Sequence, residues 1–66
     1  MMTARVHTRR GVHTLTAEYI FLDVHESFVE LRLGRSTQQP LLPKVFEVHV
    51  FSERELVSLE IKGERP

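Results

Sequence analysis

Histidines are the residues of this chain best suited to bind a metal, and their spacing decides whether they can do so. There are four of them, His7, His13, His25 and His49. A zinc site needs three or four histidine, cysteine or carboxylate ligands at well-defined spacings. The chain has no cysteine, and neither an H-x-H nor an H-E-x-x-H pattern occurs. We therefore expect no metal ion and no cofactor.

Serine and glutamate side chains are also placed poorly for catalysis. No serine stands in a G-x-S-x-G turn, and no glycine-rich phosphate loop is present. Glu30, Glu47 and Glu60 fall on polar faces of predicted strands, where they can pair with Arg32 or Lys62 on a neighbouring strand. An acid–base pair would need a cleft that shifts one pKa, and so short a chain has little room for one. The sequence thus predicts a protein that is not an enzyme.

Basic side chains gather near the N-terminus, although the chain as a whole has a net charge of zero. Residues 1–16 contain arginines and histidines and no acidic residue. A basic stripe beside aromatic rings is a pattern with which small β folds bind single-stranded nucleic acid. Binding of RNA or single-stranded nucleic acid is therefore the alternative function. Its candidate contacts in this stripe are Arg5, Arg9 and Arg10.

Length and composition indicate one small domain, residues 1–66. Apolar residues make up 41% of the chain, which is typical of a folded protein, and at this length a single core is barely sufficient. No apolar run approaches the roughly 20 residues of a membrane helix, and the N-terminus lacks the apolar segment of a signal peptide. We expect a cytoplasmic protein.

The stretch 17–33 contains the clearest structural pattern. Val29, Leu31 and Leu33 alternate with polar or aromatic residues, and residues 19–22 are apolar at every position. Because successive side chains of a strand point to opposite faces, this pattern predicts two strands with a shared apolar face. The polar residues 25–27 between them allow an antiparallel hairpin.

The remaining strands are predicted from similar alternation. A thin strand over 3–9 is expected at a sheet edge, and 12–24 is expected to form one long strand that can bend. Residues 36–43 form a long proline-bounded loop, and 44–51 form the next strand.

The C-terminal segment has two possible structures. Residues 52–55 match a capping box, which would begin a short helix over 53–60. We favour a strand because Val57, Leu59 and Ile61 alternate with polar residues. With a polar tail over 63–66, the predicted fold is all-β: a small five-stranded antiparallel sheet or open barrel.

Apolar side chains fall on both faces of two predicted strands, which is more than one small core requires. Such a surplus predicts a surface that docks on another protein or on a second copy, as a homodimer or a hetero-complex. We expect a non-enzymatic regulator or inhibitor of this kind. The candidate contacts are Tyr19, Phe21, Phe28, Leu41, Leu42 and Phe51.

Scattered positions support the nucleic-acid alternative through a resemblance. Residues 8–10 (TRR), 14–15 (TL), 43–44 (PK) and 48–49 (VH) resemble the carbon storage regulator family, small five-stranded dimeric proteins that bind messenger RNA. The resemblance implies RNA contacts, which would be made by Arg9, Arg10, Val48 and His49. The family's glycine–glutamate and isoleucine–glycine–aspartate turns are absent, and Val50 occupies the place of an RNA-binding arginine.

Overall fold

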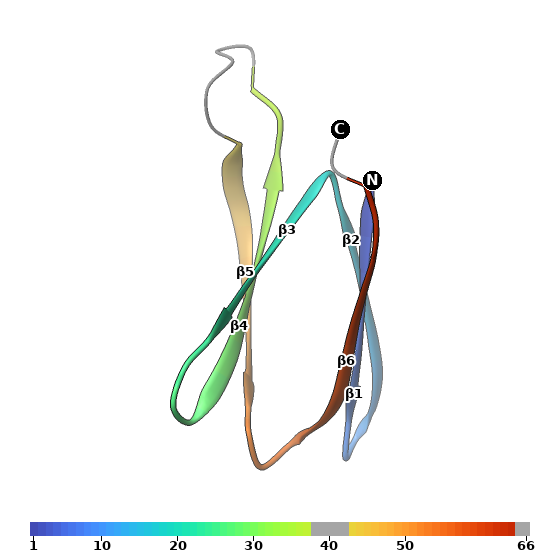
Figure 1. Cartoon of the computed structure of the whole chain (residues 1–66), viewed down its shortest axis with the longest axis vertical. Helices are drawn as coiled ribbons and strands as arrows, with labels where there is room; N and C mark the ends of the chain where they lie inside the picture. The colour runs from blue at the N-terminus through green and yellow to red at the C-terminus, as the bar shows by residue number, and fades with distance from the viewer. Residues whose placement is uncertain (38–42, 65–66) are drawn as a thin grey trace.

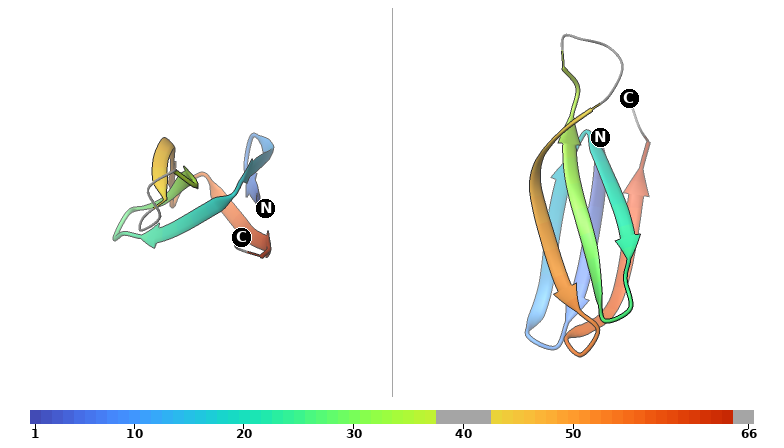
Figure 2. Two further views of the ribbon diagram at one scale, coloured as in Figure 1. Left: turned by 90° about the horizontal axis from the view of Figure 1, so that it is seen from above. Right: turned by 90° about the vertical axis from the view of Figure 1, so that its left-hand side faces the viewer.

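The computed structural model describes residues 1–37 and 43–64, which form six strands in two antiparallel sheets of three (Figure 1). The strands are β1 (Met2–Thr8), β2 (Gly11–Ala17), β3 (Tyr19–Val24), β4 (Phe28–Arg35), β5 (Lys44–Ser52) and β6 (Leu56–Gly63). The order β2–β1–β6 makes one sheet, here the terminal sheet, and β3–β4–β5 makes the other, here the central sheet. Figure 2 (right) shows the central sheet lying in front of the terminal sheet. The all-β class is confirmed.

The predicted hairpin forms the first two strands of the central sheet. β3 and β4 pair antiparallel, with Leu22 opposite Leu31 and Ile20 opposite Leu33. Leu31 and Leu33 are buried, as their alternation with polar residues predicts. The prediction that two segments of the stretch 17–33 pair as an antiparallel hairpin is therefore confirmed.

The prediction of five strands in a single sheet or barrel is wrong, because the segment 12–24 is two strands in different sheets. The chain leaves β2 at Ala17 and enters β3 at Tyr19, so that the single residue Glu18 lies between the two sheets. The carboxylate of Glu18 accepts hydrogen bonds from the backbone N–H of Ser36 (3.3 Å) and from its hydroxyl (2.7 Å). These bonds hold the corner against the end of β4.

β1 lies in the centre of the terminal sheet and not at an edge, contrary to the prediction for 3–9. It pairs antiparallel with β2 on one side and with β6 on the other. Ala4 and Val6 on its inner face are fully buried. The inner face of β1 carries small side chains because the central sheet packs directly against it. Two closely packed sheets leave little space between their backbones for larger side chains.

The C-terminal segment is a strand, so the helix over 53–60 does not form. β6 extends to Gly63, the first residue of the predicted polar tail, and pairs along β1 to Met2. Gly63 has a φ of 105°, which favours glycine, and a Cβ there would collide with the carbonyl oxygen of Met1. The strand therefore continues to a position that only glycine fits.

The hydrophobic core lies between the inner faces of the two sheets. Leu31 and Val6 are its largest fully buried side chains, and partly buried residues of β5 and β6 pack around it. The remaining buried members are Met2, Ala4, Ala17, Ile20 and Leu33. Each sheet thus has one face that covers the core and one face turned away from it.

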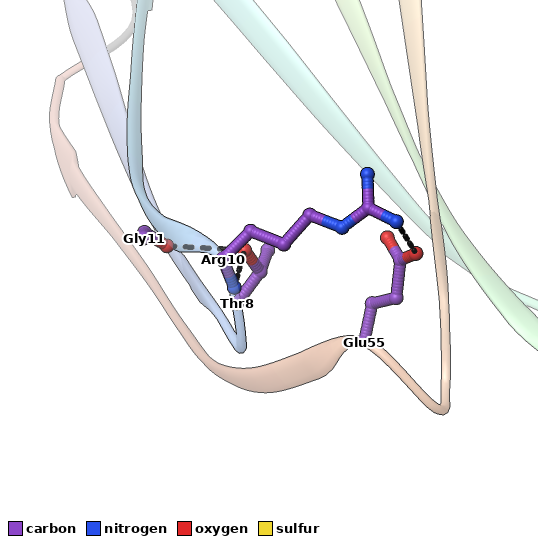
Figure 3. A network of polar contacts seen from close by, with 4 residues as sticks. All are labelled: Thr8, Arg10, Gly11 and Glu55. Atoms are coloured by element: carbon purple, nitrogen blue, oxygen red, sulfur yellow. Dashed lines mark hydrogen bonds and ion pairs between the residues drawn. The ribbon is translucent and has the colours of Figure 1, made fainter.

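Three turns meet at one end of the molecule, at the bottom of Figure 1. The backbone N–H of Arg9 donates to the carbonyl of Glu55 (3.0 Å), and that of Glu53 donates to the carbonyl of Ser27 (3.0 Å). The Thr8 hydroxyl donates to the Gly11 carbonyl (3.1 Å) within the first turn (Figure 3). The β5–β6 turn therefore links the two sheets through backbone hydrogen bonds.

None of the residues that the structure describes belongs to a helix that could cross a membrane.

Candidate protein-docking surface

The face of the central sheet that is turned away from the core carries aromatic and apolar side chains. On β3 the residues that alternate with buried Ile20 are Tyr19, Phe21 and Asp23. On β4 the residues that alternate with Leu31 and Leu33 are Phe28, Glu30 and Arg32. The register places Phe21 opposite Arg32 and Asp23 opposite Glu30, so both sets share one face. We call it the outer face of the central sheet.

β5 adds three valines to this outer face. Arg32 pairs with Val48 and Glu30 pairs with Val50 across the β4–β5 ladder. Between Leu33 and Gly34 the register shifts by one residue, which brings Val45 opposite Gly34 and onto the same side as the other two valines. Val45, Val48 and Val50 are 38%, 49% and 58% exposed. The edge of the outer face is therefore apolar and open to solvent.

Arg32 lies near the middle of the outer face and is held in place by two neighbours. One of its terminal nitrogens contacts Asp23 Oδ2 at 2.8 Å, and its guanidinium carbon lies 5.8 Å from the centre of the Phe21 ring. The Phe21 ring is parallel to that of Tyr19 at 6.1 Å. The Nε atom of Arg32 is buried and has no hydrogen-bond partner among the described residues. A fixed cation thus lies among stacked rings.

A shallow depression of about 270 Å³ lies beside Arg32. It is lined by Phe21, Arg32, Pro43 and Val45. Gly34 shapes its floor, because a Cβ there would lie 3.3 Å from the Phe21 ring and 3.5 Å from the Pro43 side chain. The volume is at the low end for a small-molecule pocket, and it suits one inserted side chain of a larger partner.

The far end of the outer face carries a second aromatic contact. The His25 ring stacks on the Phe28 ring with centroids 4.3 Å apart and an angle of 18°. His25 Nε2 also lies 3.5 Å from Glu30 Oε1. Rings at both ends of the face are therefore packed against neighbours. Because these side chains already have few rotamers, a partner that binds them loses less conformational entropy.

The structure brings together some of the predicted docking residues and separates others. Tyr19, Phe21 and Phe28 share the outer face and are half-buried. Phe51 pairs with Val29 on the opposite, inner face and lies 5.7 Å from the His13 ring of the terminal sheet. Phe51 therefore belongs with the core. Leu41 and Leu42 lie outside the described residues.

Val48 and Val50 lie on the outer face, and the sequence analysis did not include them among the candidate contacts. Both faces of β5 carry apolar side chains, so alternation within the strand cannot show which face covers the core. The pairing of His49 with buried Leu31 decides it, because paired residues point to the same face.

The residues of the nucleic-acid alternative lie on three different parts of the molecule. Arg5 is on the outer face of the terminal sheet, paired with Thr14 and Glu60, whereas Arg9 and Arg10 follow β1 in its turn. His49 is on the inner face of the central sheet, where its Nε2 lies 2.7 Å from a Glu47 carboxylate oxygen.

Acidic residues lie close to these basic groups. Arg10 is 3.9 Å from Glu55 (Figure 3). The Lys62 ammonium lies 2.7 Å from Glu60, and its hydrogen bond and charge lower the pKa of that carboxyl. A depression on this face is lined by Thr3, Arg5, Glu60 and Lys62, so it presents a carboxylate as well as cations. Six strands in two sheets also differ from the five-stranded fold that the resemblance implies.

In the described part of the chain, no three histidine or carboxylate side chains lie close enough together to hold a metal ion.

Comparison of the chain with known protein families, with curated proteins and with solved structures found no match.

Proposed function

We propose that this protein is a non-enzymatic binding module that acts as a regulator or inhibitor by docking the outer face of the central sheet on another protein. The observation that carries the proposal is the exposure of Val45, Val48 and Val50 on the same outer face as the rings of Tyr19 and Phe21. Contiguous apolar side chains exposed on a soluble protein are typical of an interaction site.

The composition of the outer face supports a protein as the ligand. Aromatic residues and arginine are enriched at the centres of protein interfaces, whereas lysine and glutamate are depleted there. Arg32 has this central place, between Phe21 and Val48 on the neighbouring strands. Its buried Nε and the adjacent depression favour a partner that inserts an apolar side chain and brings a carbonyl or carboxylate oxygen close to the guanidinium.

Among the described residues, the outer face of the terminal sheet offers no comparable apolar area for a partner. The outer face of the terminal sheet consists mainly of threonines and charged residues, among them Thr14, Arg5 and Glu60. The contrast between the two outer faces provides a matched control within one chain.

Photo-crosslinking tests the proposal in the native host. The photoreactive residue p-benzoylphenylalanine replaces Val48 in one variant and Thr14, on the other outer face, in the control. We expect the Val48 position to yield one defined adduct with a protein other than a second copy of this chain, and Thr14 to yield none, and we expect Phe21→Ser to abolish that adduct. The proposal is refuted if both positions label the same proteins equally, if Val48 labels none, or if Phe21→Ser leaves the adduct unchanged.

A further inference from the structure

β5 forms an edge of the central sheet. It is nine residues long and, within residues 1–37 and 43–64, pairs with β4 alone. It also carries four of the nine large apolar side chains that are exposed in the described residues. A long apolar edge strand is a template for pairing with another strand, and natural proteins normally protect such edges with charges, bulges or covering segments.

The other three edges are better protected or less apolar. β3 is only six residues long, and β6 carries Glu60 and Lys62 in adjacent outward positions. β2 has one large exposed apolar side chain, that of Val12. β5 is therefore the edge best suited to accept another strand, and its residues 47–49 lie in the part that pairs regularly with β4, beyond the bulge at Phe46.

We propose that β5 pairs antiparallel with β5 of a second copy about a two-fold axis at Val48, which joins two central sheets into one of six strands. This register places Val48 opposite Val48 and Glu47 opposite His49, twice. The two groups of each cross-pair already bind one another within a chain, at 2.7 Å. Hydrogen-bonded polar pairs and β-branched pairs opposite one another stabilise neighbouring strands.

Other registers that keep the two outer faces on the same side of the joined sheet are less favourable. An axis at Glu47 places two carboxylates opposite one another, and an axis at Val50 places Glu47 opposite Glu53. Like charges directly opposite destabilise a strand pair. An axis at His49 places each Glu47 opposite Phe51, so only the axis at Val48 gives both carboxylates a hydrogen-bonding partner.

The accessible surface of the chain is consistent with a second copy. The chain exposes 5013 Å². A folded monomer of 7.7 kDa is expected to expose about 4300 Å², so the excess is about 700 Å². A standard protein interface hides about 800 Å² on each partner. The excess is thus comparable with the area that one standard interface hides.

Edge pairing goes beyond the proposed function and can fail independently of it. Glu47 and His49 lie on the inner face of the central sheet, because they pair with Leu33 and Leu31. The side chains that fix the register are therefore distinct from those of the outer face, and changing them leaves Phe21 and Arg32 in place.

Complementary charge variants test the register by sedimentation velocity. The lysine variant carries Glu47→Lys and His49→Lys, and the glutamate variant carries His49→Glu. We expect the wild type to dimerise with rising concentration, each variant alone to dimerise more weakly, and an equimolar mixture to dimerise about tenfold more tightly than either variant. As a control, Thr14→Lys mixed with Thr14→Glu should show no gain. Circular dichroism checks that each variant is folded.

A cysteine variant tests the same axis if a charge variant fails to fold. The chain has no cysteine, so Val48→Cys introduces a single thiol. At a two-fold axis the two copies of this residue face one another at a distance that permits a disulfide. We expect air oxidation to yield a covalent dimer of Val48→Cys, and Val12→Cys, which replaces a similarly exposed valine, to stay monomeric. A wild type that is monomeric at millimolar concentration, a mixture no tighter than its components, or equal oxidation of both cysteine variants overturns the proposal.

Discussion

Replacing Leu31 by alanine should unfold most of the protein. Leu31 is 0% exposed, lies in the middle of β4 and pairs with Leu22. A leucine-to-alanine change at a buried site costs about 2–5 kcal/mol, because the apolar contacts are lost and a cavity remains. A single core in a chain of this length rarely provides more than about 3–5 kcal/mol of net stability. The expected loss is therefore comparable with the whole free energy of unfolding.

Val50→Ala is the matched control. Val50 lies on the adjacent strand opposite Glu30, and its side chain is 58% exposed. Because less than half of its apolar surface is hidden, removing two methyl groups should cost less than about 1 kcal/mol. Urea titration followed by far-ultraviolet circular dichroism measures both free energies of unfolding. Loss of the adduct formed from position 48, in a fully folded Val50→Ala variant, would also support the proposed docking function.

Equal destabilisation by the two substitutions would refute this assignment of faces. It would mean that Val50 is as buried as Leu31 in solution, so that the outer face is not open to a partner. A Leu31→Ala variant as stable as the wild type would likewise show that the core does not lie between the two sheets.

Three further predictions concern other parts of the chain. Gly63→Ala should lower the free energy of unfolding by more than about 1 kcal/mol, measured by urea titration, because its φ is 105° and a Cβ would meet the Met1 carbonyl. Hydrogen bonds from Ser36 lower the pKa of Glu18, so the stability they provide should be present above pH 4.5 and lost as the pH falls through the folded-state pKa. Thermal unfolding of Glu18→Gln should show a smaller acid-side loss than the wild type. Arg10→Ala should change the free energy of unfolding by less than about 0.5 kcal/mol, because its ion pair is exposed.

The hairpin could be predicted from the sequence because its alternation is regular and one face is charged. The division into two sheets could not be read so directly, yet a signal was present. In β2 the inward positions are odd-numbered, with Leu15 and Ala17 among them, whereas in β3 Ile20 and the residues that alternate with it are even-numbered. A continuous strand cannot change phase in this way, so the shift at Glu18 marks the corner.

The outer face of the central sheet could be predicted only in part. Tyr19, Phe21 and Phe28 share one alternation, so the sequence places them on a common face. Phe51 was assigned to the wrong face because β5 is apolar on both sides. Which side covers the core depends on the strand that β5 pairs with and on a bulge, and both are set by contacts between segments distant in the sequence.

The pairing of the first strand with the last has a consequence for folding. β1 pairs with β6 along its whole length. At the ends of these strands, the N-terminal nitrogen of Met1 donates a hydrogen bond to the carbonyl of Glu64 (3.1 Å). During synthesis on a ribosome, the middle strand of the terminal sheet must therefore wait for β6, which is synthesised after the other five strands. Contacts of such high sequence separation slow folding, and we expect a refolding rate below that of helical domains of equal size. Until β6 arrives, chaperones have an open edge to recognise.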